Sequence, residues 1–223
     1  MTTRKLPFTV GEWYHCYNQG IEKRVTFDDS RDFHRFLELL YLANDEFPLR
    51  RGDIHARKLE EVLSIPRGKK LVGVGAFCLM PNHFHLVLKE VSPGGISTFM
   101  RKLGTAYTLY FNARHERSGN LFLKPFRSRH LSMEHDISNA IHYVHCSPAT
   151  LYEPEWKTRT VVDPQFLAGH ISAHAYSSIG IYEGARTPLS TIIDSEIFSI
   201  APVVPIQKML QGARQYSVDS NLP

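Results

Sequence analysis

The chain has 223 residues, of which 43% are hydrophobic and 22% charged, a composition typical of a folded domain. Its three cysteines form no CxxC pair and are odd in number, which excludes a zinc knuckle and a disulfide framework. The sequence begins without an apolar segment of the signal-peptide type, and its longest nearly apolar run, 71–80, is too short to span a bilayer. We therefore expect a cytoplasmic protein with no membrane role.

Charge is distributed unevenly along the chain, whose formal net charge is +4. The first 150 residues carry 21 basic and 15 acidic side chains, whereas the remainder carries 5 basic and 7 acidic ones. A basic region of this kind favours a polyanionic partner, because clustered Lys and Arg side chains attract phosphate groups.

Hydrophobic spacing and turn residues predict alternating strands and helices. In the first half we expect a strand at 12–19, a helix at 31–44, a polar loop with one short helix at 45–70, and tightly joined strands at 71–80 and 84–90. In the second half we expect a helix from 96 to about 118, an extended segment at 121–131, and a helix at 134–147.

This order of elements predicts an α+β fold with an antiparallel or mixed sheet. Residues 1–150 contain every clearly periodic segment and are expected to form one domain. Residues 151–223 contain several prolines and only weak periodicity, so we expect a C-terminal extension packed on that domain or extending it.

His83 and His85 are the first candidates for a functional site. They are two residues apart on a predicted strand, so their side chains share one face, while Phe84, Leu86 and Leu88 point into a core on the other. Two imidazoles about 7 Å apart on one strand face can bind a single divalent metal ion. With twelve histidines in the chain, a chance pair without a function is the alternative.

Tyr143 is the second candidate. It lies on a polar flank of helix 134–147, with Asn139 and Ser147 one turn before and one turn after it. Such a flank is suited to line a cleft, although a structural tyrosine explains the same pattern. His142 and His145 fall elsewhere on the helix and are expected at the surface or behind the site.

Residues 99–130 combine positive charge with aromatic rings. This segment contains seven Lys or Arg residues but a single acidic residue, Glu116, and six aromatic residues are interleaved with the basic ones. Cations for phosphates and rings for unstacked bases are typical of surfaces that bind single-stranded nucleic acid. Several of these rings are expected in the core, whereas Lys124, Arg127 and Arg129 are expected to contact phosphates.

The sequence contains no glycine-rich phosphate loop, Gly-x-Ser-x-Gly elbow or HExxH motif, which leaves few enzyme classes. Four segments together resemble the single-tyrosine HUH transposases, most closely the group associated with repetitive extragenic palindromes (REP). The most specific feature is Pro-Asn-His-x-His-Leu followed by Tyr-(x)4-Pro. The matching segments are Tyr14–Gly20 with Phe27–Asp29, Met80–Val87, Ser118–Phe122 with Phe126–Arg129, and Tyr143–Ala149.

The resemblance implies a ferredoxin-like α+β sandwich whose central antiparallel sheet carries the two histidines. It also implies a nucleoid-associated nuclease and strand transferase that cuts single-stranded DNA beside a hairpin during DNA transposition. His83 and His85 would hold one Mg²⁺ or Mn²⁺ that polarises the scissile phosphate. Tyr143 would attack the phosphorus to give a 5′-phosphotyrosine and a free 3′-OH. A homodimer and a monomer are both compatible with the resemblance.

The resemblance also assigns roles to residues around the site. Asn82 and Asn139 would lie next to the metal ligands and orient them without contacting the metal. The hairpin would be bound by basic side chains, namely Arg50, Arg51, Arg101, Lys102, Lys124, Arg127 and Arg129.

Ser147 departs from the family pattern, because that position usually carries an amide side chain that completes the metal site. Three alternatives follow. Water or Asn139 completes the metal site, the affinity for the metal is reduced, or the protein is a decayed DNA- or RNA-binding module that no longer cuts. A rival class, the nucleotide hydrolases with a His-x-His-x-His strand, is disfavoured because the third position is Val87.

Overall fold

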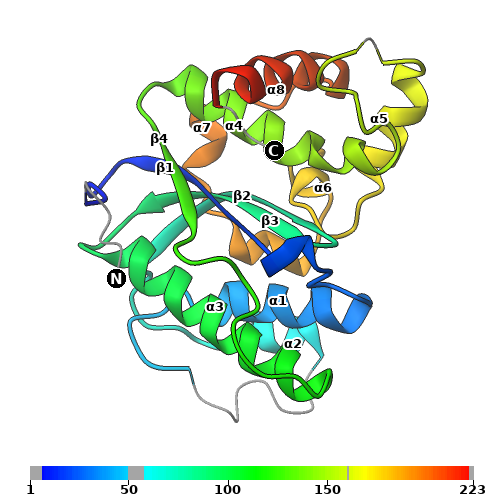
Figure 1. The fold of residues 1–223 in the computed structure, drawn as a ribbon. Helices are drawn as coiled ribbons and strands as arrows, with labels where there is room; N and C mark the ends of the chain where they lie inside the picture. The colour runs from blue at the N-terminus through cyan, green and yellow to red at the C-terminus, as the bar shows by residue number, and fades with distance from the viewer. Residues whose placement is uncertain (1–6, 50–57, 160, 221–223) are drawn as a thin grey trace.

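The computed structural model describes residues 7–49, 58–159 and 161–220. Its centre is a four-stranded sheet (Figure 1). The strands are β1 (Trp13–Gln19), β2 (Val72–Met80), β3 (His83–Glu90) and β4 (Arg127–Leu131), in the spatial order β2-β3-β1-β4. All neighbouring strands are antiparallel. With one helix after β1 and one after β3, this is the ferredoxin-like βαββαβ arrangement, and the predicted α+β fold is confirmed.

One face of the sheet is covered by α1 (Ser30–Leu42), α2 (Leu59–Leu63) and α3 (Gly95–Arg114), as Figure 1 shows. The side chains of β3 that were predicted to face a core do so here. Phe84 packs against Phe36 of α1 and against Phe122, with ring centroids 4.8 and 5.4 Å apart. Leu86 and Leu88 are fully buried. Burial of these rings and aliphatic chains is the main stabilising term on this side of the sheet.

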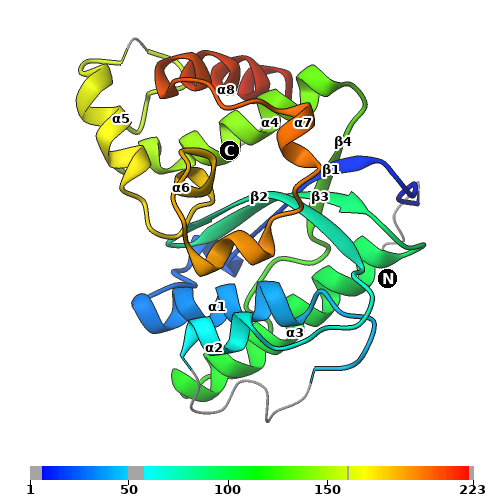
Figure 2. The same cartoon turned by 180° about the vertical axis from the view of Figure 1, so that it is seen from behind.

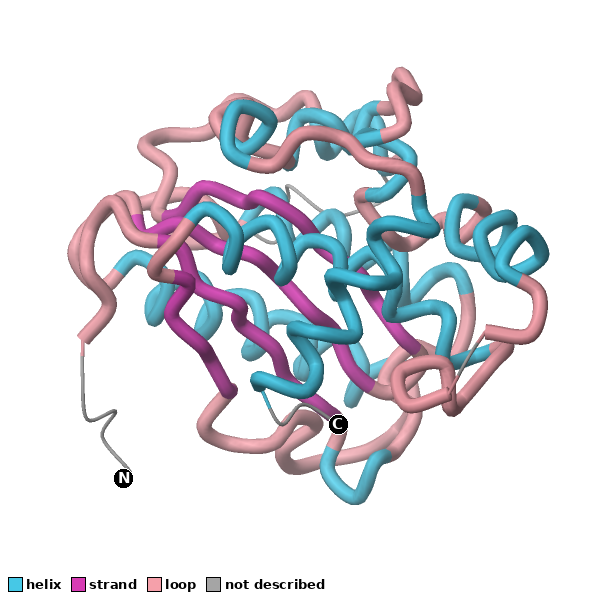
Figure 3. The backbone as a smooth tube through the Cα atoms, turned by 90° about the horizontal axis from the view of Figure 1, so that it is seen from above, coloured by secondary structure: helices cyan, strands magenta, loops and turns pink. Residues whose placement is uncertain are grey.

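The other face is covered by α4 (Glu134–Cys146) and by α8 (Ile206–Ser220), which packs on α4. Figure 3 shows helices lying across the strands on this side. The shorter helical segments are η1 (Ile21–Lys23), η3 (Ser147–Leu151), α5 (Pro164–Ser172), α6 (Ile179–Tyr182), η4 (Pro188–Ile192) and α7 (Ile197–Ile200). Within the described residues, no helix is long and apolar enough to cross a bilayer.

The C-terminal part of the chain shields the exposed edge of β2, and Figure 2 shows the segment from α6 to α7 running along that strand. Leu79 N–H donates to the Tyr176 carbonyl at 2.9 Å, and Ser178 N–H donates to the Phe77 carbonyl at 3.0 Å. Further along, Asp194 N–H donates to a carbonyl of β2 at 2.8 Å. These bonds satisfy backbone groups that an open edge strand would leave free to pair with another chain.

Two sequence predictions differ from the structure. Only Arg127–Leu131 of the predicted extended segment 121–131 is a strand, and the preceding residues touch the sheet through an isolated bridge between Gly20 and Phe122. Helix α8 was not predicted, although its buried residues follow helical spacing, namely Ile206, Met209, Leu210, Ala213 and Tyr216. Its other residues are polar or small, so the apolar stripe did not stand out in the weakly periodic C-terminal part.

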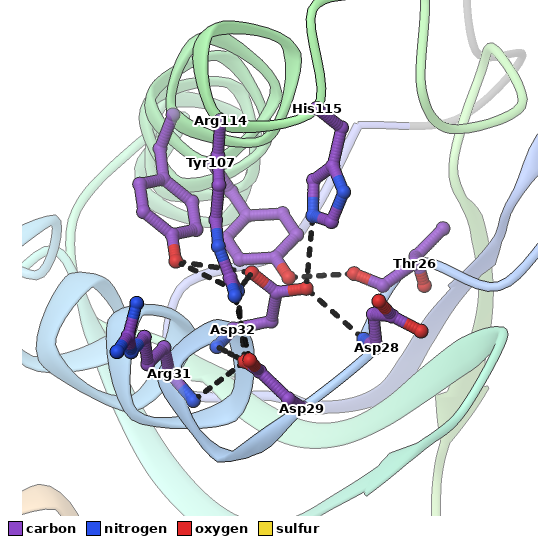
Figure 4. Close-up of polar contacts among 9 residues, drawn as sticks. Thr26, Asp28, Asp29, Arg31, Asp32, Tyr107, Arg114 and His115 are labelled. Carbon is purple, nitrogen blue, oxygen red and sulfur yellow. Dashed lines mark hydrogen bonds and ion pairs between the residues drawn. The ribbon is translucent and has the colours of Figure 1, made fainter.

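Asp32 is the centre of a buried polar network that joins the start of α1 to the end of α3 (Figure 4). Its side chain is fully buried and accepts hydrogen bonds from Asp28 N–H at 3.0 Å and from the Tyr110 hydroxyl at 3.0 Å. Arg114 contacts Asp32 at 2.5 Å and Asp29, the N-cap of α1, at 2.6 Å. The network therefore sets the position of the two helices beneath the sheet.

We predict that Asp32→Ala lowers the free energy of unfolding by about 3 kcal/mol, because the change leaves a guanidinium and a hydroxyl without their buried acceptor. Urea unfolding followed by circular dichroism measures this. Glu155→Ala, which removes an exposed partner of Arg159, is the matched control and should cost much less. Equal costs for the two variants would show that the network does not hold the helices.

Candidate active site

Strand β3 presents His83 and His85 on the face covered by α4. Successive side chains of a strand alternate, so the residues that place Phe84 in the opposite core place both imidazoles here. Their ring centroids are 5.0 Å apart. His85 is almost fully buried, whereas His83 is partly exposed.

The protonated nitrogen of His83 is determined by Asn82. His83 Nδ1 lies 2.6 Å from the Asn82 side-chain oxygen, and the Asn82 amide nitrogen donates to the Lys23 carbonyl at 3.2 Å. The second bond orients the amide, so its oxygen accepts the Nδ1 proton. His83 Nε2 is left with a lone pair, as in a metal-ligating histidine.

A chain of buried hydrogen bonds connects His85 to the C-terminal helix. His85 Nδ1 lies 3.0 Å from Nε2 of His15 on β1, and His15 Nδ1 lies 3.1 Å from the hydroxyl of Tyr216 on α8. Each neutral imidazole carries one ring proton, so the tautomer of His85 is coupled through His15 to Tyr216. The orientation of His85 thus depends on three elements that are distant in sequence.

Helix α4 brings Tyr143 to the same place. Its ring lies perpendicular to that of His85 at a centroid distance of 5.4 Å and is 5.9 Å from His15. The side chain is 2% exposed. Lys157, which lies between η3 and α5, donates a hydrogen bond from its Nζ to the Tyr143 hydroxyl at 3.1 Å.

These groups line a cavity of about 300 Å³. Three cations, Lys23, Arg127 and Lys157, line it, and its described lining contains no Asp or Glu. A concave site with this charge attracts anions. The full lining is Tyr17, Asn18, Gln19, Lys23, Asn82, His83, His85, Leu123, Arg127, Tyr143, Ser147, Thr150 and Lys157.

Burial determines the protonation of the site. It lowers the pKa of His83 to about 4 and that of His85 well below its ordinary value, and the positive charge of Lys157 adds to both effects. Both imidazoles are therefore neutral at pH 7 and available as ligands. Burial also raises the pKa of Tyr143 and lowers the pKa of Lys157.

The donor set offers a divalent ion two neutral imidazoles but few other strong ligands. Among the described residues no group of three His, Cys, Asp or Glu side chains could hold a metal. The remaining donors in the cavity are neutral oxygens such as those of Tyr17 and Gln19. His83 and His85 fit as two ligands of a divalent ion whose other positions are filled by water or by oxygens of a bound phosphate.

Ser147 and Asn139 are placed differently from expectation. Ser147 lines the cavity, but its hydroxyl donates to the Tyr143 carbonyl of its own helix at 2.8 Å. Asn139 packs beside Gly212 of α8 and is not part of the cavity lining, because α4 turns that flank toward α8. Asn139 is therefore not positioned to support the two histidines.

Three of the predicted DNA-binding residues lie at hollows in the structure. Arg127 lines the cavity with the histidines. Arg101 and Lys124 line a second hollow of about 660 Å³, between α3 and the segment that leads to β4. Asn18 and Leu123 line both hollows, which are therefore adjacent.

Two further predicted DNA-binding residues, Lys102 and Arg129, make contacts within the protein. Lys102 donates to the carbonyls of Asp45 and Phe47 at 2.5 and 2.6 Å, which anchors that loop to α3. The Arg129 guanidinium lies 4.7 Å from the ring centre of Tyr216, and its Nη1 is buried without a hydrogen-bond partner in the described part of the chain. Arg50 and Arg51 lie outside the described residues.

His142 and His145 were expected at the surface or behind the site, and the structure shows that neither is a surface residue. His145 is fully buried, and its Nε2 lies 2.8 Å from the Ser178 hydroxyl. His142 is buried against α8 near Gly212. Helix α8 and the segment containing Ser178 bury the side of α4 that would otherwise face water, which local periodicity could not indicate.

Sequence reasoning missed several residues at the site, among them Lys23 in the cavity lining and His15, Lys157 and Tyr216 beside the histidines and Tyr143. His15 shares a strand face with Trp13 and Tyr17, so alternation along β1 could have indicated it once β1 was placed beside β3. Lys157 and Tyr216 belong to the C-terminal extension, where the sequence contains no pattern that points to the histidines.

Comparison with known proteins yields a similarity of fold. No protein-family model and no curated protein sequence matches the chain. Among solved structures, the chain is similar to that of a REP-associated tyrosine transposase bound to a REP hairpin. The TM-score is 0.51 over 92% of this chain and 93% of that chain, at 11% sequence identity. At this identity the similarity establishes a shared fold and no more.

We predict that acidification below pH 6.5 lowers the stability of the metal-free protein. Burial lowers the pKa of His145 to about 3 and that of His142 to about 4, whereas the unfolded chain binds these protons near pH 6.5. Each such histidine therefore removes about 1.4 kcal/mol of stability per pH unit between pH 6.5 and its folded pKa. Urea unfolding at pH 7, 6 and 5 in EDTA measures this loss.

His145→Gln should reduce the slope of stability against pH, because one buried titrating group is removed. The matched control is His135→Gln, since the side chain of His135 is 67% exposed. An unchanged slope in His145→Gln would contradict the assignment of His145 as a buried neutral imidazole.

Proposed function

We propose that the chain is a single-strand DNA nuclease and strand transferase of the single-tyrosine HUH type, which cleaves beside a hairpin through a 5′-phosphotyrosine on Tyr143. The observation that carries the proposal is the meeting of His83, His85 and Tyr143 in one basic cavity. Their sequence separation makes this convergence informative, because only the fold brings β3 and α4 together.

The solved neighbour supports the choice of partner. It is a REP-associated tyrosine transposase bound to a REP hairpin, and it shares its fold with this chain over almost the full length of both. Together with the motif resemblance, this favours hairpin-forming, palindromic single-stranded DNA as the substrate and DNA transposition as the process. His83, His85 and Tyr143 all come from one chain, so a monomer can assemble the site, and a homodimer is compatible with it.

His83 and His85 would hold Mg²⁺ or Mn²⁺. When bound, the ion supplies positive charge that polarises the scissile phosphate. Both imidazoles are neutral, and Asn82 leaves the His83 Nε2 lone pair free, so neither must lose a proton to act as a ligand.

The protein's own cations bind the DNA backbone. Lys23 and Arg127 line the cavity and provide charge-assisted donors for phosphate oxygens. Arg101 and Lys124 extend the positive charge to the second hollow, which suits the nucleotides next to the cleavage site. Tyr143 attacks phosphorus, and the phosphotyrosine that forms preserves the ester for rejoining without a nucleotide cofactor.

A second candidate is a hairpin DNA- or RNA-binding protein that no longer cleaves. Two observations favour it, namely the 2% exposure of Tyr143 and the absence of a side-chain amide at Ser147. A nucleophile this buried reaches a phosphate only if the DNA enters the cavity. Measurements of hairpin cleavage in Mn²⁺ and of hairpin binding in EDTA distinguish the two candidates, because only the nuclease shows both.

We predict that a labelled hairpin oligonucleotide from palindromes flanking the gene forms a covalent adduct with the wild-type chain in Mn²⁺. The adduct survives boiling in detergent and is resolved by gel electrophoresis. Tyr143→Phe should abolish it, and His83→Ala should slow it at least about 100-fold, because positive charge at the phosphate is lost. Tyr152→Phe, at a tyrosine that is 43% exposed, is the control. Hairpin binding without any adduct would favour the binding-only candidate.

We further predict that Ser147→Ala leaves Mn²⁺ affinity unchanged, because the serine hydroxyl is held against the Tyr143 carbonyl. His83→Ala in the same titration should weaken binding at least about tenfold. Isothermal titration calorimetry with Mn²⁺ alone measures both. A comparable loss in the two variants would make Ser147 the third ligand.

A further inference from the structure

Lys157 is a charged group in hydrogen-bond contact with the candidate nucleophile. Its Nζ lies 3.1 Å from the Tyr143 hydroxyl oxygen and 5.1 Å from the centre of the same ring. It lies 14 positions after the tyrosine, in the segment between η3 and α5 that the sequence suggested was only an extension.

The position of Lys157 is determined by its neighbours on both sides. The preceding residue, Trp156, is 1% exposed, and its indole nitrogen donates to the Thr150 hydroxyl at 3.0 Å. Arg214 of α8 donates to the carbonyls of Trp156 and Arg159 at 2.7 and 2.6 Å. Lys157 is thus held between a core residue and the C-terminal helix, as a preorganised functional group requires.

The chemistry of the nucleophile needs such a group. A phenol with an ordinary pKa near 10 is mostly protonated at pH 7, so its oxygen gains negative charge only as the proton leaves. A cation held in hydrogen-bond contact with that oxygen, as Lys157 is, stabilises the charge that develops. A hydrogen bond from an ammonium to a phenolate is stronger than the same bond to a neutral phenol, so the Lys157 contact strengthens as the proton leaves.

We propose that Lys157 is a catalytic residue of the cleavage reaction, whose ammonium stabilises the Tyr143 phenolate as it attacks the phosphate. This rests on the proposed function. In cleavage the phenol proton passes to water, the Tyr143 oxygen forms a bond to phosphorus, the bond from phosphorus to the 3′ oxygen breaks, and that oxygen takes a proton from water. Lys157 stays an ammonium throughout. Rejoining is the reverse sequence.

The test is the single-turnover rate of adduct formation with the labelled hairpin in Mn²⁺ at pH 7. Lys157→Met removes the charge from a side chain of similar length and should slow the adduct about 100-fold, with hairpin binding retained. Lys157→Arg keeps the charge and should recover most of the rate. Lys208→Met, at an exposed lysine of α8, should leave the rate unchanged.

A chemical rescue separates stabilisation of the phenolate from simple positioning of DNA. Trifluorotyrosine placed at Tyr143 ionises more readily, so it should accelerate Lys157→Met far more than the wild-type chain. The proposal is overturned if Lys157→Met forms the adduct at the wild-type rate. It is also overturned if the lower rate of Lys157→Met is explained by weaker hairpin binding, or if trifluorotyrosine does not restore the rate. Absence of any adduct with the wild-type chain would instead overturn the proposed cleavage function itself.

Discussion

The packing of α4 across the sheet, mainly over β2 and β3, is the interaction on which the candidate site depends. The apolar side of α4 includes Ile141 and Val144, both almost fully buried, so the helix can sit on the sheet in only one orientation. That orientation directs Tyr143 toward His85. Helix α8 packs on the outer side of α4 and prevents it from tilting away. The packing of α4 between the sheet and α8 therefore both stabilises the fold and sets the geometry of the site.

The site combines neutral imidazoles with an excess of positive charge. Burial lowers the pKa of His83 and His85 and so favours their neutral forms, and the positive charge of Lys157 favours them further. In the absence of an anion, these positive charges repel one another and any divalent ion. A phosphate in the cavity would relieve that repulsion. DNA and metal are thus expected to bind together, each increasing the affinity for the other.

The C-terminal residues contribute to the site as well as to the fold. They pair with the edge of β2, supply Tyr216 to the hydrogen-bonded chain that ends at His85, and hold Lys157 beside the Tyr143 hydroxyl. A ferredoxin-like sheet with α1, α3 and α4 alone would carry the two histidines and Tyr143 but would leave Tyr143 without its charged neighbour. A boundary drawn at residue 150 therefore separates parts that contribute to one cavity.

Local patterns in the sequence were sufficient to predict β1, β2 and β3, the helices of the first 150 residues, and the shared face of His83 and His85, because alternation and helical spacing act over a few residues. They placed β4 but overestimated its length. The tyrosine and the histidine pair were predicted separately, and their contact was implied only by the family resemblance. His15, Lys157, Tyr216, the burial of His145 and the position of Asn139 depended on the packing of α8 and the neighbouring loops. Such contacts join residues up to 201 positions apart. No short-range pattern encodes these contacts. Each forms only when two segments that are distant in the sequence pack against each other and exclude water from the surface between them.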